Sequence, residues 1–253
     1  MLNLTERTNP VHFPTQYNKF EFDDEVAVIF NNMAVRSIPL YLQAHELHAH
    51  IAHTHIKGLF SLWNQKRATI LDVGTSVGGF LHAVCNQFQI DPNTGSDEIR
   101  YIGTDISPPM LAEFSRHYPW AESICCAADG AGQKDNSVDV VCIMYVLQFV
   151  PAAQRDGVLR ALYNSMKDNA IIFLGQKEEP FNAIRPSLSY EYIQWRKGNG
   201  YTEAEIAAKT KALELVMWPE TLADTKHRLE RVGFRFIHET TRWLQFSTLM
   251  ARK

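Results

Sequence analysis

The sequence LDVGTSVGGF (residues 71–80) runs from a strand-like apolar segment into a glycine-containing turn that opens a helix. Small residues let the backbone approach a ligand there, and the first turn of a helix offers N–H groups to an anion. The dinucleotide pattern requires glycine at its first, third and sixth places, which here are Gly74, Ser76 and Gly79, so a nicotinamide cofactor is disfavoured. The turn better suits the carboxylate and ammonium groups of a methionine moiety, and the residues concerned are Asp72, Gly74, Thr75 and Ser76. A tight turn without a ligand is the alternative.

Two further carboxylates follow the next two predicted strands. Asp105, in YIGTDIS, closes the second strand, where a carboxylate can accept hydrogen bonds from both hydroxyls of a ribose. Capping of the following helix is the alternative role, although Ser107 is the better cap. Asp129, in AADG, closes the third strand, from which it could reach an adenine amino group, but an Asp-Gly pair is as often a simple turn.

The segment HELHAHIAHTH contains half of the chain's ten histidines. On a helix, His45, His48 and His55 share one side, whereas His50 and His53 point away from it. The segment lacks the HExxH spacing of a zinc helix, because the second histidine follows Glu46 by two residues. We therefore expect a partly solvated helix face, with one histidine entering the pocket and no bound metal.

The elements that position these residues are strands alternating with helices. Nearly continuous apolar runs predict buried strands over residues 68–74, 99–106, 123–128, 138–146 and 170–175. Helices are predicted from residue 79 to about 88, from 108 to 117, from 151 to 166 and around 222 to 232, the last ending at Gly233. This alternation indicates a parallel sheet covered by helices on both faces, an α/β fold.

The C-terminus departs from this alternation, because FRFIHETTRW and LQFSTLMARK follow one another directly and predict an antiparallel hairpin. A seven-stranded sheet with such a hairpin is the architecture of class I (Rossmann-like) S-adenosyl-L-methionine (SAM) dependent methyltransferases. In that architecture MYVLQF, after the fourth strand, faces the transferred group, with Met144 and Gln148 its candidate site residues. We expect a helical N-terminal cover over residues 1–65 and a SAM-binding domain over 66–253, with a helical insertion, or lid, at about 177–220.

Composition narrows the class of protein. A formal charge of -3 supplies no field for a polyanion, so no direct nucleic-acid partner is expected. No apolar run approaches the length of about 18 residues that a bilayer requires, and the first residues lack the pattern of a secretion signal, so we expect a cytoplasmic protein without a membrane partner. The cysteines lack CxxC spacing and are expected to be reduced core residues: Cys85, Cys125, Cys126 and Cys142.

Several segments together resemble the carboxy-SAM synthases of bacterial tRNA wobble-uridine modification. They are FEFDDEVAVIFNNMAVRSIPLY, LDVGTSVGG, GTDISPPML, YVLQFV, GNGYTEAEIAAKTKALELVM, TKHRLERVGF and LQFSTLMARK. The resemblance implies the class I fold, a homodimer, and conversion of SAM and prephenate to carboxy-SAM. It also implies a set of residues lining the nucleoside and methionine sites, namely Tyr41, Gly74, Thr75, Ser76, Asp105, Ile106 and Asp129.

The sequence departs from the family pattern at four positions. Thr75 replaces a cysteine, Ile106 and Met144 each replace an asparagine, and Thr210 replaces an arginine that the resemblance assigns to the extra carboxylate of carboxy-SAM. An uncharged threonine cannot offer a bidentate pair to a carboxylate. Lys211, one residue further on a helix, would point about 100° away. We therefore expect no preference for the carboxylated sulfonium and no formation of carboxy-SAM.

The sequence as a whole predicts a SAM-dependent methyltransferase that acts on a small-molecule acceptor. Catalysis would consist mainly of placing the acceptor in line with the sulfonium methyl group. The polar candidates for the acceptor pocket are Tyr41, His45, Arg196 and Tyr201. Two alternatives remain open: a carboxy-SAM synthase, and a non-catalytic SAM-binding subunit that would retain the cofactor unchanged.

Overall fold

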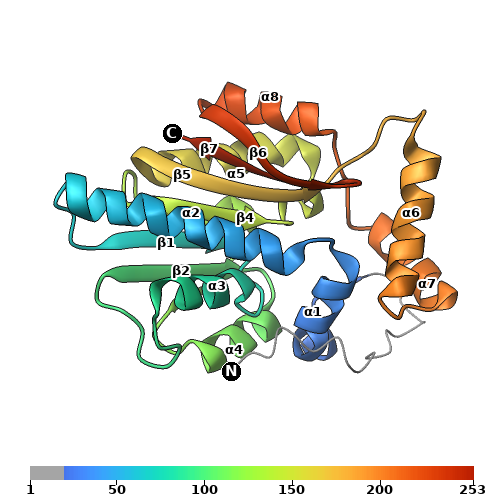
Figure 1. Ribbon diagram of the computed structural model, residues 1–253, viewed down its shortest axis with the longest axis horizontal. Helices are drawn as coiled ribbons and strands as arrows, with labels where there is room; N and C mark the ends of the chain where they lie inside the picture. Colours follow the sequence, from blue (N-terminus) through green and yellow to red (C-terminus); the bar gives the residue numbers. More distant parts are fainter. Residues whose placement is uncertain (1–19) are drawn as a thin grey trace.

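The computed structural model describes residues 20–253, which contain one mixed sheet of seven strands (Figure 1). The strands are β1 (Ala68–Val73), β2 (Ile99–Asp105), β3 (Glu122–Cys125), β4 (Val138–Met144), β5 (Met166–Lys177), β6 (Arg235–Trp243) and β7 (Phe246–Arg252). They lie in the order β3-β2-β1-β4-β5-β7-β6. β1 to β5 are parallel to one another, whereas β7 runs antiparallel to both β5 and β6. The predicted seven-stranded fold with a C-terminal antiparallel hairpin is therefore confirmed.

The helices of the described chain are α1 (Asp24–Ser37), α2 (Tyr41–Leu62), α3 (Gly79–Phe88), α4 (Pro108–His117), α5 (Ala152–Ser165), α6 (Arg185–Gly198), α7 (Glu203–Glu214) and α8 (Leu222–Val232). Two single turns, η1 (Ala128–Gly130) and η2 (Leu147–Phe149), follow β3 and β4. Ser107 caps α4 by accepting a hydrogen bond from the Met110 N–H at 3.3 Å, and Gly233 ends α8, both as predicted. None of these helices is long and apolar enough to cross a membrane.

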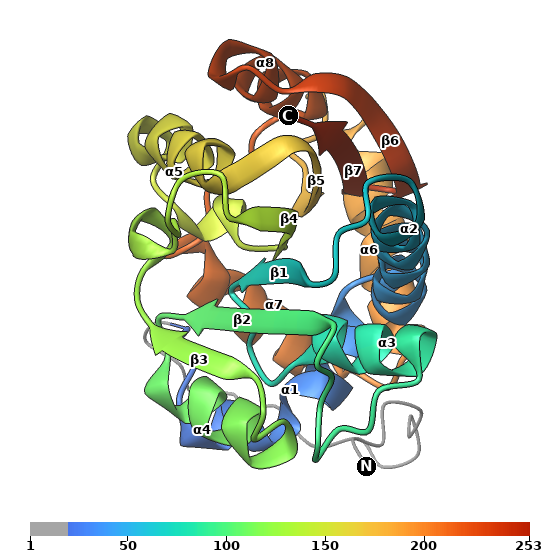
Figure 2. The same ribbon diagram turned by 90° about the vertical axis from the view of Figure 1, so that its left-hand side faces the viewer.

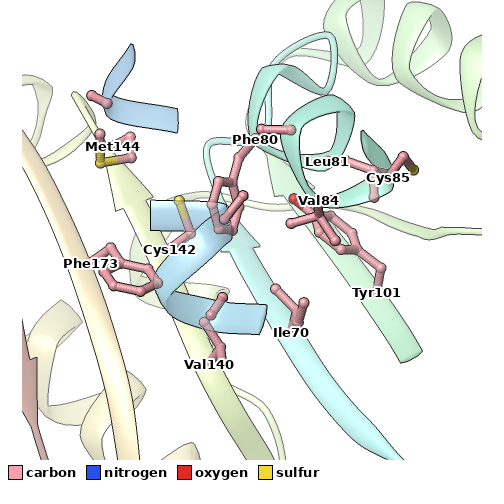
Figure 3. Close-up of a cluster of buried hydrophobic side chains, with 14 of the residues drawn as sticks. Ile70, Phe80, Leu81, Val84, Cys85, Tyr101, Val140, Cys142, Met144 and Phe173 are labelled. Atoms are coloured by element: carbon pink, nitrogen blue, oxygen red, sulfur yellow. The ribbon is translucent and has the colours of Figure 1, made fainter. Parts of the chain in front are cut away.

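The sheet is covered on both faces, as the buried strands require (Figure 2). On one face, alternate strand residues such as Ile70 and Phe173 pack against α2 and α3. Figure 3 shows Phe80 of α3 on this face, and its ring lies 6.3 Å from that of Phe173. On the other face, the intervening residues, such as Leu71 and Ile172, pack against α5 and α8. The two clusters fix the orientation of the strands whose ends carry the predicted site.

β3 differs from the prediction of a strand buried on both faces. All four of its residues are exposed, because β3 is the edge strand of the sheet and pairs only with β2. Cys125 is therefore exposed and Cys126 half-buried, which corrects the expectation of core cysteines at these positions. Cys85 and Cys142 are buried, as predicted.

α1 and the segment that contains α6 and α7 meet at Ser37, the last residue of α1. Its carbonyl oxygen accepts a hydrogen bond from the Tyr192 hydroxyl of α6 at 2.7 Å. Its own hydroxyl lies 2.9 Å from that of Tyr201 and accepts a bond from the Lys209 ammonium of α7 at 2.7 Å. In Figure 1, α1, α6 and α7 accordingly gather at one end of the sheet.

Candidate functional site

A cavity of about 530 Å³ lies at the carboxyl ends of β1, β2 and β4, beneath α1, α6 and α7. Its volume is within the range of about 300 to 1,000 Å³ typical of small-molecule sites, and open α/β sheets bind ligands at this edge. Most of the predicted site residues line it, namely Tyr41, His45, Asp72, Gly74, Thr75, Ser76, Asp105, Ile106, Met144 and Arg196. The sequence thus located the cavity through residues far apart in the chain.

The turn after β1 owes its shape to two residues in the left-handed region. Gly74 has φ +69°, and a Cβ atom there would lie 2.3 Å from Val146 Cγ2, so no other residue fits without movement. Ser76 has φ +52°, which is uncommon for a residue with a side chain. Its N–H donates to Asp105 Oδ2 at 2.9 Å. The turn is therefore fastened to the end of β2.

Asp105 presents its carboxylate to the cavity from the end of β2. Each of its oxygens accepts one backbone N–H, from Ser76 on one side and from Ser107 on the other, both at 2.9 Å. Burial raises the pKa of Asp105, and these two N–H groups oppose the shift. Because a carboxylate oxygen can accept more than one hydrogen bond, the group retains acceptor capacity for a pair of ligand hydroxyls.

Asp72 lies beneath the turn and is buried. Its Oδ2 atom accepts hydrogen bonds from the Thr75 and Tyr101 hydroxyls, both at 2.8 Å. Burial raises the pKa of Asp72 to about 6, although the Thr75 and Tyr101 bonds favour the ionised form. The hydroxyl of Thr75 therefore holds the turn to β1, a positioning role that its residue type alone did not indicate.

The end of β4 supplies the apolar wall of the cavity. Met144 is 8% exposed, and a Cβ atom on Gly175 would lie 2.9 Å from its sulfur, so the absence of a side chain at Gly175 leaves room for Met144. Tyr145 has φ +62°, and its N–H donates to the Gly175 carbonyl at 2.7 Å. No sequence pattern indicated this backbone conformation. Ile106, which follows β2 and lines the same cavity, is 67% exposed.

Among the charged side chains that line the cavity are Lys177 at the end of β5, Arg196 on α6 and Lys209 on α7. Arg185, Glu179 and Glu214 line it as well, and Arg185 forms an ion pair with Glu179. Burial lowers the pKa of Lys177 to about 8, and Arg196 adds to this shift. Burial, followed by Arg196, also holds the pKa of Lys209 well below its ordinary value. Among the described residues, no carboxylate pairs with Arg196 or Lys177. We call Lys177, Arg196 and Lys209 the cationic wall.

Arg196 lies next to Thr210, the position from which the loss of a carboxylate-binding arginine was inferred. Its guanidinium packs 4.4 Å from the centre of the Tyr192 ring, and its Nη2 atom lies 3.5 Å from the Thr210 hydroxyl. Arg196 is 6% exposed, and its Nε atom has no hydrogen-bond partner among the described residues. Lys211 is exposed and does not line the cavity, as its helical spacing predicted. An arginine therefore occupies the space beside Thr210, supplied by a neighbouring helix.

Two predicted site residues lie outside the cavity. Asp129 is exposed in η1 and is not among the lining residues, because β3 ends early and the turn carries this side chain outward. Tyr201 is 5% exposed and does not line the cavity, although its hydroxyl lies 2.9 Å from that of Ser37, which does. Conversely, Lys177 was missed, since a single lysine after an apolar strand has no distinctive spacing. Its place at the carboxyl end of β5, beside β4, is the signal that could have indicated it.

The histidines of α2 divide in part as their helical spacing predicted. His45 and His48 are buried, His55 is half-buried and His50 is exposed. His53, which was expected to point away, is half-buried too, and its ring lies 4.7 Å from that of Phe88. His45 lines the cavity, whereas the Nε2 atom of His48 lies 2.9 Å from the Thr240 hydroxyl on β6. Within residues 20–253, no group of three histidine, cysteine or acidic side chains could hold a metal ion.

We expect the purified protein to contain no stoichiometric metal. The two buried histidines lie three residues apart on α2, and burial lowers the pKa of His45 to about 3 and that of His48 to about 4. A structural or catalytic zinc site needs about three or four convergent ligands, and no third ligand lies beside them in the described chain. Elemental analysis after dialysis against a chelator tests this. Zinc, iron or nickel at one equivalent per chain would contradict it.

Comparison with known proteins agrees with the geometry. A family model described as a methyltransferase domain matches residues 71–172. The carboxy-S-adenosyl-L-methionine synthase of Helicobacter pylori is 32% identical over 239 residues, which cover 93% of this chain and 95% of that protein. A SAM-dependent methyltransferase of Methanococcus maripaludis has a TM-score of 0.55 at 16% identity, covering 94% of this chain and 96% of its own.

A second solved structure extends the comparison of folds. The 1,6-didemethyltoxoflavin-N1-methyltransferase of Burkholderia thailandensis, solved with its substrate and S-adenosylhomocysteine, has a TM-score of 0.56 at 13% identity. The alignment covers 91% of this chain and 85% of that protein. At 16% and 13% identity, the two solved structures establish only the fold of this chain. The 32% identity to the synthase over nearly the whole chain also establishes its family.

Proposed function

The chain belongs to the carboxy-S-adenosyl-L-methionine synthase family, and because Thr210 replaces the arginine that the resemblance assigns to the carboxylate of carboxy-SAM, we propose that it instead transfers the methyl group of SAM to a small organic anion. Its family and fold are those of SAM-dependent methyltransferases, and SAM is the cofactor of this class. The observation that supports an anionic second substrate is the cationic wall, which lines the same cavity as the glycine turn and Asp105.

The residues of the cavity fit this cofactor. Asp105 retains acceptor capacity for ribose hydroxyls, and the exposed Ile106 next to it offers an apolar surface for a base. The turn from Gly74 to Ser76 lets a ligand approach the N-terminus of α3, where a carboxylate is favoured. When bound, the cofactor supplies an electrophilic methyl group on a positively charged sulfur.

The contribution of the protein is placement and charge balance. Lys177, Arg196 and Lys209 already repel one another, and a sulfonium in the same cavity adds a further positive charge. An anion held by Arg196 and Lys177 relieves this repulsion and is fixed in orientation by the planar guanidinium. Orienting a second substrate in this way lowers the barrier without a strong base in the site.

Transfer of labelled methyl groups from SAM to a panel of small carboxylates, phosphates and neutral analogues tests the proposal. We expect turnover with anionic acceptors, and we expect Arg196→Gln to lower kcat/KM for them by about tenfold or more. Lys211→Gln removes the same charge from an exposed position of α7 outside the cavity and serves as the control. Equal turnover of neutral analogues would contradict an anion site. Retention of unchanged cofactor with every acceptor would favour a binding subunit.

A second candidate function is synthesis of carboxy-SAM. The observation that favours it is the position of the Arg196 guanidinium beside Thr210, where the family resemblance places a carboxylate-binding arginine. Incubation with SAM and prephenate, followed by mass spectrometry of the nucleosides, separates the two functions. Carboxy-SAM formed at an enzymatic rate would replace the methyl-transfer proposal. If none forms, we expect Thr210→Arg to raise the affinity for added carboxy-SAM.

Anion binding should weaken as the pH rises through about 8. Lys177 is protonated below its pKa of about 8 and loses its charge above it, while a carboxylate ligand stays ionised. We expect affinity for a carboxylate substrate to fall about fivefold between pH 7 and pH 9, measured by calorimetry on enzyme saturated with S-adenosylhomocysteine. Lys177→Met should flatten this profile at reduced affinity, and Lys177→Arg should flatten it at high affinity. A profile that Lys177→Met leaves unchanged would assign the titration to another group.

We further propose that the enzyme acts in the cytoplasm as a homodimer, without direct nucleic-acid or membrane partners. The family resemblance supports the homodimer, and the formal charge of -3 supports the absence of a polyanionic partner. Light scattering during size-exclusion chromatography gives the oligomeric state. A mass of 28.9 kDa, that of a single chain, would contradict the homodimer.

A further inference from the structure

His45 is a buried polar side chain that the methyl-transfer scheme above does not use. It is 5% exposed, and neither of its ring nitrogens has a hydrogen-bond partner among the described residues. A buried imidazole without partners is costly, because its polar atoms have lost water and gained nothing in return. The side chain lines the cavity, so a bound molecule can supply the missing partner.

The surroundings of His45 indicate what that partner is. The Tyr41 ring packs edge-on against the imidazole, with the ring centres 4.5 Å apart. Both side chains converge on Gly79, the first residue of α3. A Cβ atom built there would lie 2.9 Å from the Tyr41 hydroxyl oxygen and 3.6 Å from His45 Nε2. Glycine at this position therefore leaves an open space between two polar side-chain atoms.

The start of α3 adds a second kind of donor at the same place. Gly78 precedes the helix with φ +93°, and no side chain caps the first turn. The N–H groups at a helix N-terminus attract anions. A hydroxyl, an imidazole N–H and this uncapped helix end form a donor set suited to a carboxylate. The cationic wall is made of other residues, so the two sites are distinct in composition.

We propose that His45 is a cofactor-binding residue that donates a hydrogen bond to the α-carboxylate of the amino-acid moiety, together with Tyr41 and the N-terminus of α3. This inference rests on the proposed use of SAM and assigns His45 to the cofactor rather than to the acceptor. A neutral imidazole has one N–H to donate, and burial keeps His45 neutral. The same burial makes it a poor proton acceptor, which disfavours the alternative of a general base.

Paired ligands test this assignment by binding alone. S-adenosylhomocysteine contains the amino-acid moiety, whereas 5′-methylthioadenosine lacks it and keeps the nucleoside and the sulfur. In calorimetry, we expect His45→Leu to lower the affinity for S-adenosylhomocysteine about tenfold or more. The affinity for 5′-methylthioadenosine should fall less than about twofold. His45→Gln, which retains an N–H donor, should recover part of the loss. His48→Gln is the matched control on the same helix, because His48 faces Thr240 outside the cavity.

A measurement on the unmodified protein guards against variants that fold poorly. We expect the ¹⁵N signals of the His45 imidazole to shift on addition of S-adenosylhomocysteine and to stay unchanged with 5′-methylthioadenosine. The assignment would be overturned if His45→Leu lowered the affinity for both ligands equally, or for neither. The proposed function would remain intact in both cases. Failure of the unmodified protein to bind S-adenosylhomocysteine would instead overturn the proposed function.

Discussion

Glu220→Gln should lower the free energy of unfolding by about 3 kcal/mol, because it leaves a buried arginine without its counter-charge. The Arg155 side chain is 2% exposed, and its Nη1 atom lies 2.8 Å from Glu220 Oε2. Arg155 also donates to the Val150 carbonyl at 2.8 Å and to that of Trp218. Urea unfolding followed by circular dichroism measures the change as a shift in midpoint at constant slope.

Asp156→Asn is the matched control for this prediction. Asp156 and Glu220 both pair with Arg228, but the Asp156 side chain is 37% exposed, whereas that of Glu220 is 13% exposed. Exposed ion pairs contribute about 1 kcal/mol or less. If Glu220→Gln, like Asp156→Asn, lowered the free energy of unfolding by only about 1 kcal/mol or less, the two carbonyl groups alone would satisfy Arg155.

Asp105→Ala should weaken the binding of SAM and S-adenosylhomocysteine by at least about tenfold, since a buried ribose contact contributes about 1.4 kcal/mol or more. The carboxylate also accepts the Ser76 N–H, so the variant loosens the turn that approaches the ligand. Asp105→Asn keeps one acceptor oxygen and should show a smaller loss. Calorimetry at constant salt concentration measures all three affinities.

Asp129→Ala provides the control for Asp105. Both carboxylates follow neighbouring strands, and both were assigned to the nucleoside on sequence grounds. The structure leaves Asp129 exposed outside the cavity lining, so we expect its removal to change the affinity less than about twofold. If both variants lower the affinity for the cofactor equally, the segment after the third strand contributes to the site. If neither variant lowers this affinity, the ribose binds elsewhere.

The elements were predictable wherever one local pattern decided the structure. β1 and β2 are apolar runs between clear turn residues, and α4 and α8 have unambiguous end signals in Ser107 and Gly233. The predicted burial of β3 was wrong, because an apolar segment does not by itself show that the strand will lie at the edge of the sheet. Position in a sheet depends on the pairing of distant segments, which a local pattern does not encode.

The same limit explains what was missed in the site. Gly74, Ser76 and Asp105 follow their strands directly, so the shared edge of a parallel sheet brings them together without further information. Arg196 and Thr210 are on different helices, and their contact depends on how α6 packs against α7. The hypothesis drawn from Thr210 considered one position in the sequence, whereas the charge beside that position comes from Arg196 on another helix.

The contacts of Ser37 place a constraint on how this protein can be divided or altered. One residue at the end of α1 binds side chains from both helices of the insertion, about 150 to 170 positions later in the chain. Removing residues 1–65 to isolate a minimal domain would therefore also release α6 and α7, and with them Arg196 and Lys209. Over evolutionary time, insertions or deletions near the end of α1 and within residues 177–220 should be accepted only in compensating pairs. The helices that cover the cavity thus form one packed unit, which two separate stretches of sequence encode.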